Sequence, residues 1–297
     1  MATTPTAAPS PARRRLAAIR ARLRPFMPVL RVVGFVAAVG IVVWMGVQAA
    51  AEVERDQLAW GWIAASVPAV AIWWLLLANG WALLVEGRTT RHDVSVWCRT
   101  QALRFLPGGI WAPASRATVV HGAMVEKIAA VAGENLLALG AAVTLGGVAM
   151  ALAGHVWWIA LTPALLVPVV AAYRLEGRVR VTPRRATQGA LNYLVAFLAY
   201  AAGAVLVQVA VSGSVDVPLV AGAASLAWAA GLVVVIAPSG IGVRELVYVE
   251  LMASSLPHAE LAAGAVALRL VSILAELVVL LIAGRPTKRR TDPAPAT

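Results

Sequence analysis

Charged side chains within apolar sequence are the residues of this chain best suited to bind or transform a ligand. A charge inside a membrane costs about 2.5–3.5 kcal/mol on insertion scales, so each one needs a partner or a function. Six charges lie in such sequence: Glu134, Arg244, Glu245, Glu250, Arg269 and Glu276. Because the arginine fork donates two parallel hydrogen bonds to a phosphate, this set favours binding of an anionic group. The alternative is that opposite charges only pair with one another and join helices.

Arg269 and Glu276 indicate that these charges meet across helices. Their separation of seven residues places them on one helix face, but about 10 Å apart along the axis. They are therefore too distant to pair closely with each other. We expect each to have a partner on another helix, with Glu134, Arg244 and Glu245 as the candidates.

A segment rich in glycine and proline, 99–116, reads RTQALRFLPGGIWAPASR and is too short and too interrupted to span a membrane. Pro107, Gly108 and Gly109 break a helix, since proline lacks the amide donor and glycine permits positive φ. We expect the segment to dip into the cytoplasmic leaflet or to lie on its surface. A helix end there, beside Arg104 and Arg116, would bind an anion such as a lipid phosphate. The alternative is a plain amphipathic connector.

A second broken segment, PSGIG at 238–242, repeats this pattern with Pro238, Gly240 and Gly242. An arginine follows each segment, at Arg116 and Arg244. The recurrence predicts a four-plus-four internal repeat, with two broken elements that meet in the cytoplasmic half of the bundle, as in many transporters.

The composition identifies the elements that must position these residues. Of 297 residues, 61% are hydrophobic and only 13% are charged, whereas soluble domains are about 25% charged. Apolar runs long enough to span a membrane lie at 30–51, 58–85, 128–153, 156–173, 189–211, 217–237 and 259–284. Five tryptophans fit positions at the interface between membrane and water: Trp60, Trp62, Trp97, Trp157 and Trp158. We predict an all-α, polytopic membrane helix bundle.

The basic residues predict the topology. The net charge is +11, and 22 of the 25 basic residues fall in four clusters: before or at the first span, at 88–127, at 174–185 and at 285–290. Such clusters mark the cytoplasmic loops of membrane proteins, so nucleic acid is not the expected partner. Three spans after 185 would leave the last cluster outside. We therefore predict an eighth crossing at 241–256, as a short, broken helix, with both termini cytoplasmic and the protein in the cell membrane.

The predicted organisation has three parts. Residues 1–28 form a disordered, basic cytoplasmic arm, 29–284 form one transmembrane domain, and 285–297 form a basic cytoplasmic tail. The alanines at 49–51 resemble a signal-peptidase site, but an apolar run of about 20 residues is longer than a signal peptide, so we expect the first span to be retained.

Four stretches resemble, in order, the signature regions of the flippase-like family, the lysylphosphatidylglycerol synthase transmembrane region: RFLPGGIWAPASR, AAVAGENLLALG, APSGIGVRE and ALRLVSILAEL. The resemblance covers about residues 30–284 and is most specific at 238–245. Asn135 stands where the family usually has arginine, and Ser239 where it usually has glycine. The resemblance implies translocation of phospholipids or lipid-linked sugars. Only 13 residues follow Gly284, so we do not expect the aminoacyltransferase domain that larger members carry.

The leading hypothesis is therefore a non-enzymatic lipid flippase. Its expected partner is an anionic phospholipid or a polyprenyl-linked glycolipid, and its expected associates are further copies of the chain or a separately encoded envelope enzyme. No nucleotide-binding loop, metal-ligand spacing or cysteine cluster is present in the sequence, so no cofactor is expected. The alternatives are an integral-membrane lipid or glycosyl transferase and a non-catalytic partner of an envelope enzyme.

Overall fold

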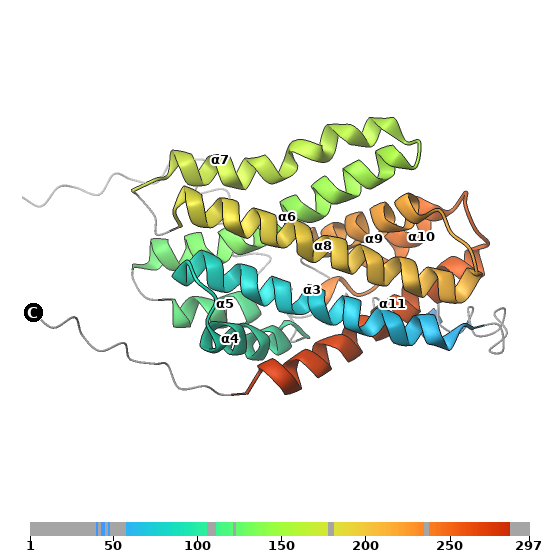
Figure 1. The fold of residues 1–297 in the computed structure, drawn as a ribbon, viewed down its shortest axis with the longest axis horizontal. Coiled ribbons are helices and arrows are strands. Elements are labelled where there is room, and N and C mark those ends of the chain that lie inside the picture. The colour runs from blue at the N-terminus through green and yellow to red at the C-terminus, as the bar shows by residue number, and fades with distance from the viewer. Residues whose placement is uncertain are drawn as a thin grey trace, which may run out of the picture.

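The structure is a computed structural model that describes residues 40, 43, 44, 47, 58–105, 111–120, 123–177, 181–234 and 238–285. The described part is all-helical and contains no strand (Figure 1). The expected arm at 1–28 and all but four residues of the expected first span at 30–51 lie outside it.

Five helical segments are long and apolar enough to cross a membrane. They are α3 (Trp60–Glu86), α6 (Met124–Leu152), the segment Val156–Arg174, α8 (Pro183–Ser212) and α11 (His258–Ala283). They match five of the predicted apolar runs. The chain is therefore compatible with an integral membrane protein.

The helices α3 and α8 form the centre of the bundle and run antiparallel. At one end the backbone amide of Ala59 donates to the carbonyl oxygen of Ala210, and at the other Arg185 donates to that of Val85. Gly80 permits close packing, because a Cβ there would lie 2.6 Å from the Tyr193 ring. These contacts align the two helices along their full length.

The third long segment, Val156–Arg174, begins as a 3-10 helix, η3 (Val156–Leu165), and continues as α7 (Leu166–Arg174). It packs on α6, where Thr144 Oγ1 donates to the Thr162 carbonyl oxygen and accepts from the Leu165 amide. Most of its apolar side chains are exposed, as expected of an outer helix that faces lipid.

The helices α9 (Val217–Val233) and α10 (Val243–Met252) form a helical hairpin. At the tip, η4 (Pro238–Gly240) folds back on α9, because Gly240 lies against the backbone of Gly231. The open ends of both arms connect to the same end of the bundle, where α8 finishes and α11 begins (Figure 1). The tip lies near the middle of the bundle, since Arg269, twelfth of 26 residues in α11, donates to the Ser239 carbonyl oxygen.

The hairpin changes the interpretation of the predicted eighth crossing at 241–256. The short helix and its irregular start are present, but ten residues of α10 reach only about 15 Å, half of a hydrocarbon core of about 30 Å. The crossing is therefore not confirmed. The four-plus-four repeat and the span count of eight are not confirmed either.

The segment 99–116 forms parts of α4 (Arg91–Gln101), the 3-10 turn η2 (Ala102–Phe105) and α5 (Trp111–Val119). Arg104 contacts Glu276 on α11 and lies over the ring of Trp74 on α3, so the end of η2 has entered the bundle. Its glycine-proline turn, with Pro107, Gly108 and Gly109, lies outside the described residues.

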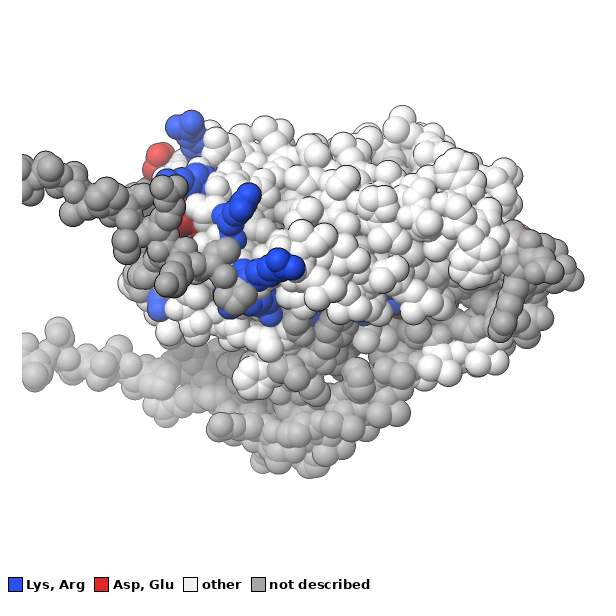
Figure 2. All heavy atoms as spheres, turned by 60° about the horizontal axis from the view of Figure 1, so that its bottom comes forward, with Lys and Arg blue, Asp and Glu red and all other residues white. Residues whose placement is uncertain are grey.

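Exposed arginines gather at the end of the bundle where α3, α7 and α11 finish and α8 begins (Figure 2). They include Arg88, Arg91, Arg174, Arg184 and Arg285. The side chain of Ser95 donates to the carbonyl oxygen of Arg285 there, which joins the end of α11 to α4. Described members of three of the predicted basic clusters therefore lie at one end of the molecule.

Candidate functional site

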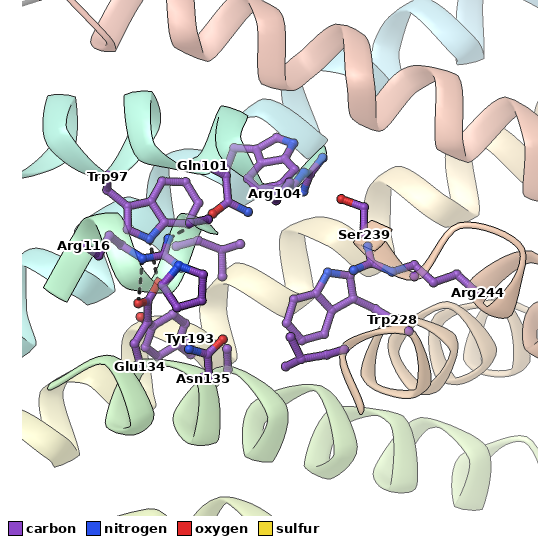
Figure 3. Close-up of a pocket in the computed structure, with 18 of the residues that line it drawn as sticks. Trp97, Gln101, Arg104, Arg116, Glu134, Asn135, Tyr193, Trp228, Ser239 and Arg244 are labelled. Carbon is purple, nitrogen blue, oxygen red and sulfur yellow. Dashed lines mark hydrogen bonds and ion pairs between the residues drawn. The ribbon is translucent and has the colours of Figure 1, made fainter. Parts of the chain in front are cut away.

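A cavity of about 160 Å³ lies between the η2 turn and the tip of the α9–α10 hairpin. Its polar lining comes from both sides, with Gln101, Arg104 and Arg116 on one and Ser239 and Arg244 on the other (Figure 3). The two broken segments singled out in the sequence thus flank one space. Their described parts are also neighbours in space, with η2 beside η4.

Arg116 is held in a buried cluster at one end of the cavity. Its Nε lies 3.2 Å from Glu134 Oε2, and its Nη1 donates to Gln101 Oε1 at 2.9 Å. Trp97 Nε1 donates to Glu134 Oε1 at 2.6 Å. Since Arg116, Glu134 and Trp97 are each at most 5% exposed, this charge pair is well compensated inside the protein.

Arg104 forms the second ion pair. Its Nη2 donates to Glu276 Oε2 on α11, and its guanidinium lies 4.5 Å from the ring centre of Trp74. The ion pair with Glu276 favours the charged form of the Arg104 guanidinium over its neutral form. The guanidinium therefore remains charged at neutral pH.

Arg269 forms the third ion pair, with Glu245. Its Nε lies 3.9 Å from Glu245 Oε1, and its two Nη atoms donate to the Ser239 carbonyl oxygen at 3.4 and 3.5 Å. Glu245 Oε2 accepts from the Gly242 amide at 2.7 Å and so caps α10. Arg269 thus binds the hairpin tip, and its partner Glu245 is one of the three candidates that the sequence offered, whereas the partner of Glu276, Arg104, is not.

Arg244 is the arginine of this cluster that has no ion-pair partner among the described residues. Its guanidinium lies 5.3 Å from the ring centre of Trp228, but its Nε is buried without a hydrogen-bond partner, and no carboxylate within the described residues forms an ion pair with it. Gly231 leaves the space for its side chain, because a Cβ there would lie 2.4 Å from Arg244 Cγ. The side chain extends along Trp228 to the cavity (Figure 3).

The ion pairs leave one positive charge in excess. Arg104, Arg116 and Arg269 are matched one to one by carboxylates, so Arg244 is the cation of this cluster that the described residues do not balance. A buried charge without a partner is costly. The cavity is therefore electrostatically suited to an anion, and the arginine fork suits the oxygens of a phosphate.

Most of the residues predicted for the site come together. Arg104, Arg116, Glu134, Gly240 and Arg244 line the cavity, Glu245, Arg269 and Glu276 pair around it, and Pro238 and Gly242 flank the hairpin tip. Pro107, Gly108 and Gly109 lie outside the described residues. Glu250, by contrast, is exposed on α10.

The sequence did not identify the aromatic and amide groups of the site. Trp97 was expected at an interface but is buried against Glu134, and Trp74, Gln101, Tyr193 and Trp228 were not predicted to line a cavity. For Trp97 and Gln101 a signal existed, since both lie within or next to the broken segment 99–116. For Tyr193, within an otherwise apolar run, we find none.

Ser239, at the tip of the α9–α10 hairpin, has an unusual backbone conformation for a residue other than glycine. Its φ of 58° lies in the left-handed region, which glycine adopts freely and serine does not. A glycine at this position would adopt the same backbone conformation without strain.

Comparison of the whole chain with family models and with curated proteins gives no match.

Proposed function

We propose that the chain is an integral membrane protein that binds the phosphate of an anionic lipid between the η2 turn and the α9–α10 hairpin and moves that headgroup across the membrane. The lipid is a phospholipid or a lipid-linked sugar phosphate, and the protein does not modify it. The basic end of the bundle faces the cytoplasm, as the positive-inside rule requires. The resemblance to the flippase-like family agrees with this proposal.

The observation that supports the proposal most is Arg244. It is a cation that extends to the cavity, and the described carboxylates around it are already paired. A purely structural cluster would gain stability by balancing this charge. A ligand that brings a negative charge of its own supplies the missing partner.

The η2 turn and the α9–α10 hairpin suggest how a headgroup could cross the membrane. The α4–α5 segment enters the bundle from the basic end, and the α9–α10 hairpin enters from the opposite end. The described end of η2 lies near η4 beside the cavity. Irregular backbone at membrane depth is tolerated where protein buries it or where it lines a wet cavity, and transporters place their sites at such broken helices.

Reconstitution tests the proposal. Purified full-length protein is placed in liposomes with fluorescent phosphatidylglycerol, phosphatidic acid, phosphatidylcholine and a polyprenyl-phosphate sugar, and the exchange of label between leaflets is followed. We expect faster exchange for anionic lipids with wild type and at least about tenfold slower exchange with Arg244→Gln. Arg184→Gln, which removes an exposed arginine outside the cavity, is the matched control.

The outcomes separate the hypotheses. Exchange equal to that of protein-free liposomes for every lipid would contradict translocation. A chemically altered lipid, detected by mass spectrometry, would favour a transferase instead. Equal effects of Arg244→Gln and Arg184→Gln would show that the cavity is not the route.

A further inference from the structure

A second cavity, of about 30 Å³, lies between α8, α9, α10 and α11, and Arg244 lines it as well as the first cavity. On α8 the first cavity is lined by Tyr193 and the second by Tyr200. These residues are seven positions apart, which places the second cavity about 10 Å further from the basic end of the bundle. Arg244 thus lies where the two cavities follow one another.

Arg269 brings a second positive charge to this cavity. Its two Nη atoms donate to the Ser239 carbonyl oxygen at 3.4 and 3.5 Å. A Cβ at Gly240 would lie 2.9 Å from Arg244 Nε, so the two guanidinium groups lie beside consecutive residues of the hairpin tip. Each positive charge disfavours the other. An anion that contacts both guanidinium groups removes this repulsion.

The charges of this cavity wall do not cancel. Glu245 is the one carboxylate that lines the cavity within the described part of the chain. Its Oε1 lies 3.9 Å from Arg269 Nε, and its Oε2 accepts from the Gly242 amide. Arg244 forms no ion pair or hydrogen bond with a described residue. Two arginines against one glutamate leave a net charge of +1, which one monovalent anion balances.

Tyr200 adds a hydrogen-bond donor to the same wall. Its side chain is 5% exposed, and its hydroxyl has no hydrogen bond among the described residues. Two other hydroxyls line the cavity, but Tyr248 donates to Gln208 and Ser272 donates to the Leu268 carbonyl oxygen. Buried hydroxyls nearly always have a partner, and that of Tyr200 lies near both guanidinium groups.

We propose that this second cavity is a chloride site, in which Arg244, Arg269 and Tyr200 donate to one ion. A volume of about 30 Å³ corresponds to roughly two water positions, and a chloride ion is only slightly larger than a water molecule. The inference goes beyond the proposed function, because the site needs no lipid. Together with the proposed function, it makes chloride and the headgroup phosphate alternative counter-ions of Arg244, one in each cavity.

Replacement of the salt anion tests the chloride site. Full-length protein in nonionic detergent is melted while sodium chloride replaces sodium gluconate at constant ionic strength, and the line width of the chlorine NMR signal reports binding directly. For wild type we expect the protein to broaden the signal. We also expect a saturable rise in melting temperature, of about 3–6 °C at ten times the dissociation constant.

Two variants locate the ion. Arg244→Gln should abolish both the line broadening and the chloride-dependent rise. Tyr200→Phe should lower the chloride affinity at least about tenfold, the range for a hydrogen bond to a charged group. Because the Tyr200 hydroxyl has no partner to lose, this variant should melt like wild type in gluconate, which checks that it folds. Tyr173→Phe, at a side chain that is 58% exposed, is the matched control and should bind chloride like wild type.

The inference is overturned if wild type shows no chloride-dependent rise, or if Arg244→Gln shows the same rise, since that would be a general salt effect. It is also overturned if Tyr200→Phe binds chloride as tightly as wild type. The proposed function fails separately, if chloride binds as expected but Arg244→Gln leaves lipid exchange unchanged.

Discussion

Glu245 Oε1 lies 3.9 Å from Nε of Arg269, and this ion pair joins the start of α10 to the middle of α11. The second carboxylate oxygen of Glu245 caps α10 at Gly242, and Arg269 also donates to the carbonyl oxygen of Ser239. One pair of side chains thus fixes both the turn and the helix that follows it. The tip beside the cavity is held in place by charge rather than by apolar packing alone.

The coupling of this pair is testable with a double-mutant cycle. Glu245→Gln or Arg269→Gln alone leaves one buried charge unpaired, so each should lower stability, by roughly 3–5 kcal/mol for such a break. The double variant removes both charges and should be less destabilised than the sum of the single losses by about 0.5–3 kcal/mol. Thermal melting in detergent measures the three variants. Additive losses would show that the two residues act independently.

The close approach at the hairpin tip predicts that Gly240→Ala is costly. Gly240 has φ of 65°, and a Cβ there would lie 2.7 Å from the Cα and the carbonyl oxygen of Gly231. An alanine at position 240 would have a strained backbone, at a cost of about 1–2 kcal/mol. The clash of its Cβ with the main chain of Gly231 adds to that cost. Gly213→Ala is the matched control, since Gly213 has φ of 75° with no atom near the added Cβ. We expect the larger loss of melting temperature at Gly240; equal losses would refute the clash.

The bond from Trp97 to Glu134 predicts a selective effect of removing the indole donor. Trp97→Phe keeps an aromatic ring but leaves Glu134 Oε1 without its donor at 2.6 Å. A hydrogen bond to a charged group contributes about 1.5–3 kcal/mol, so the variant should melt at a clearly lower temperature. Trp157→Phe, at a side chain that is 89% exposed, should melt like wild type. The prediction is wrong if both variants behave alike.

Cys98 predicts a slow, pH-dependent thiol reaction. It lies on α4, outside the five long apolar helices, and burial raises its pKa to about 11. Because the thiolate is the reactive species, maleimide labelling of the folded protein should be slow at pH 7 and should rise about tenfold per pH unit up to pH 9. Protein unfolded in dodecyl sulfate should label fast and level off near pH 8.5. A rate in the folded protein that is independent of pH would contradict this.

The topology predicts which loops share a side of the membrane. Glu176 and Ser214 are exposed next to opposite ends of α8, and Ser254 is exposed between α10 and α11. Single cysteines at these positions, in a Cys98→Ser background, are labelled in sealed vesicles with a membrane-impermeant reagent. We expect 214 and 254 to label together and 176 only after the vesicles are opened, or the reverse. Labelling of 176 with 214 would remove α8 as a crossing.

The long helices were predictable from sequence because a long apolar run has few other stable structures in a membrane protein. The α9–α10 hairpin was not predictable from sequence, for two physical reasons. Apolar composition does not distinguish a helix surrounded by lipid from one surrounded by protein, and most of α9 is buried in the bundle. In addition, the loops before α9 and after α10 lie on the same side of the membrane whether these two helices cross it twice or not at all. The distribution of arginines is therefore consistent with either arrangement.

The site was predictable in its charges but not in its partners. The cost of burying charge singled out Arg244, Glu245, Arg269 and Glu276, and the structure places these four residues close together. The partner of Glu276 proved to be Arg104, 172 residues away in the chain. The residues around these two positions do not indicate that they pair. The aromatic lining was missed because tryptophan and tyrosine occur equally in cores, at interfaces and in sites.

The 3-10 helix at Val156–Leu165 has a consequence for the membrane that the protein fits. Nineteen residues of α-helix would extend about 28 Å, slightly less than a typical hydrocarbon thickness. With ten of them in the 3-10 form, which rises about 2.0 Å per residue, the segment extends about 33 Å. Conformation, rather than added residues, thus brings this short outer segment to the length of a typical hydrocarbon core of about 30 Å.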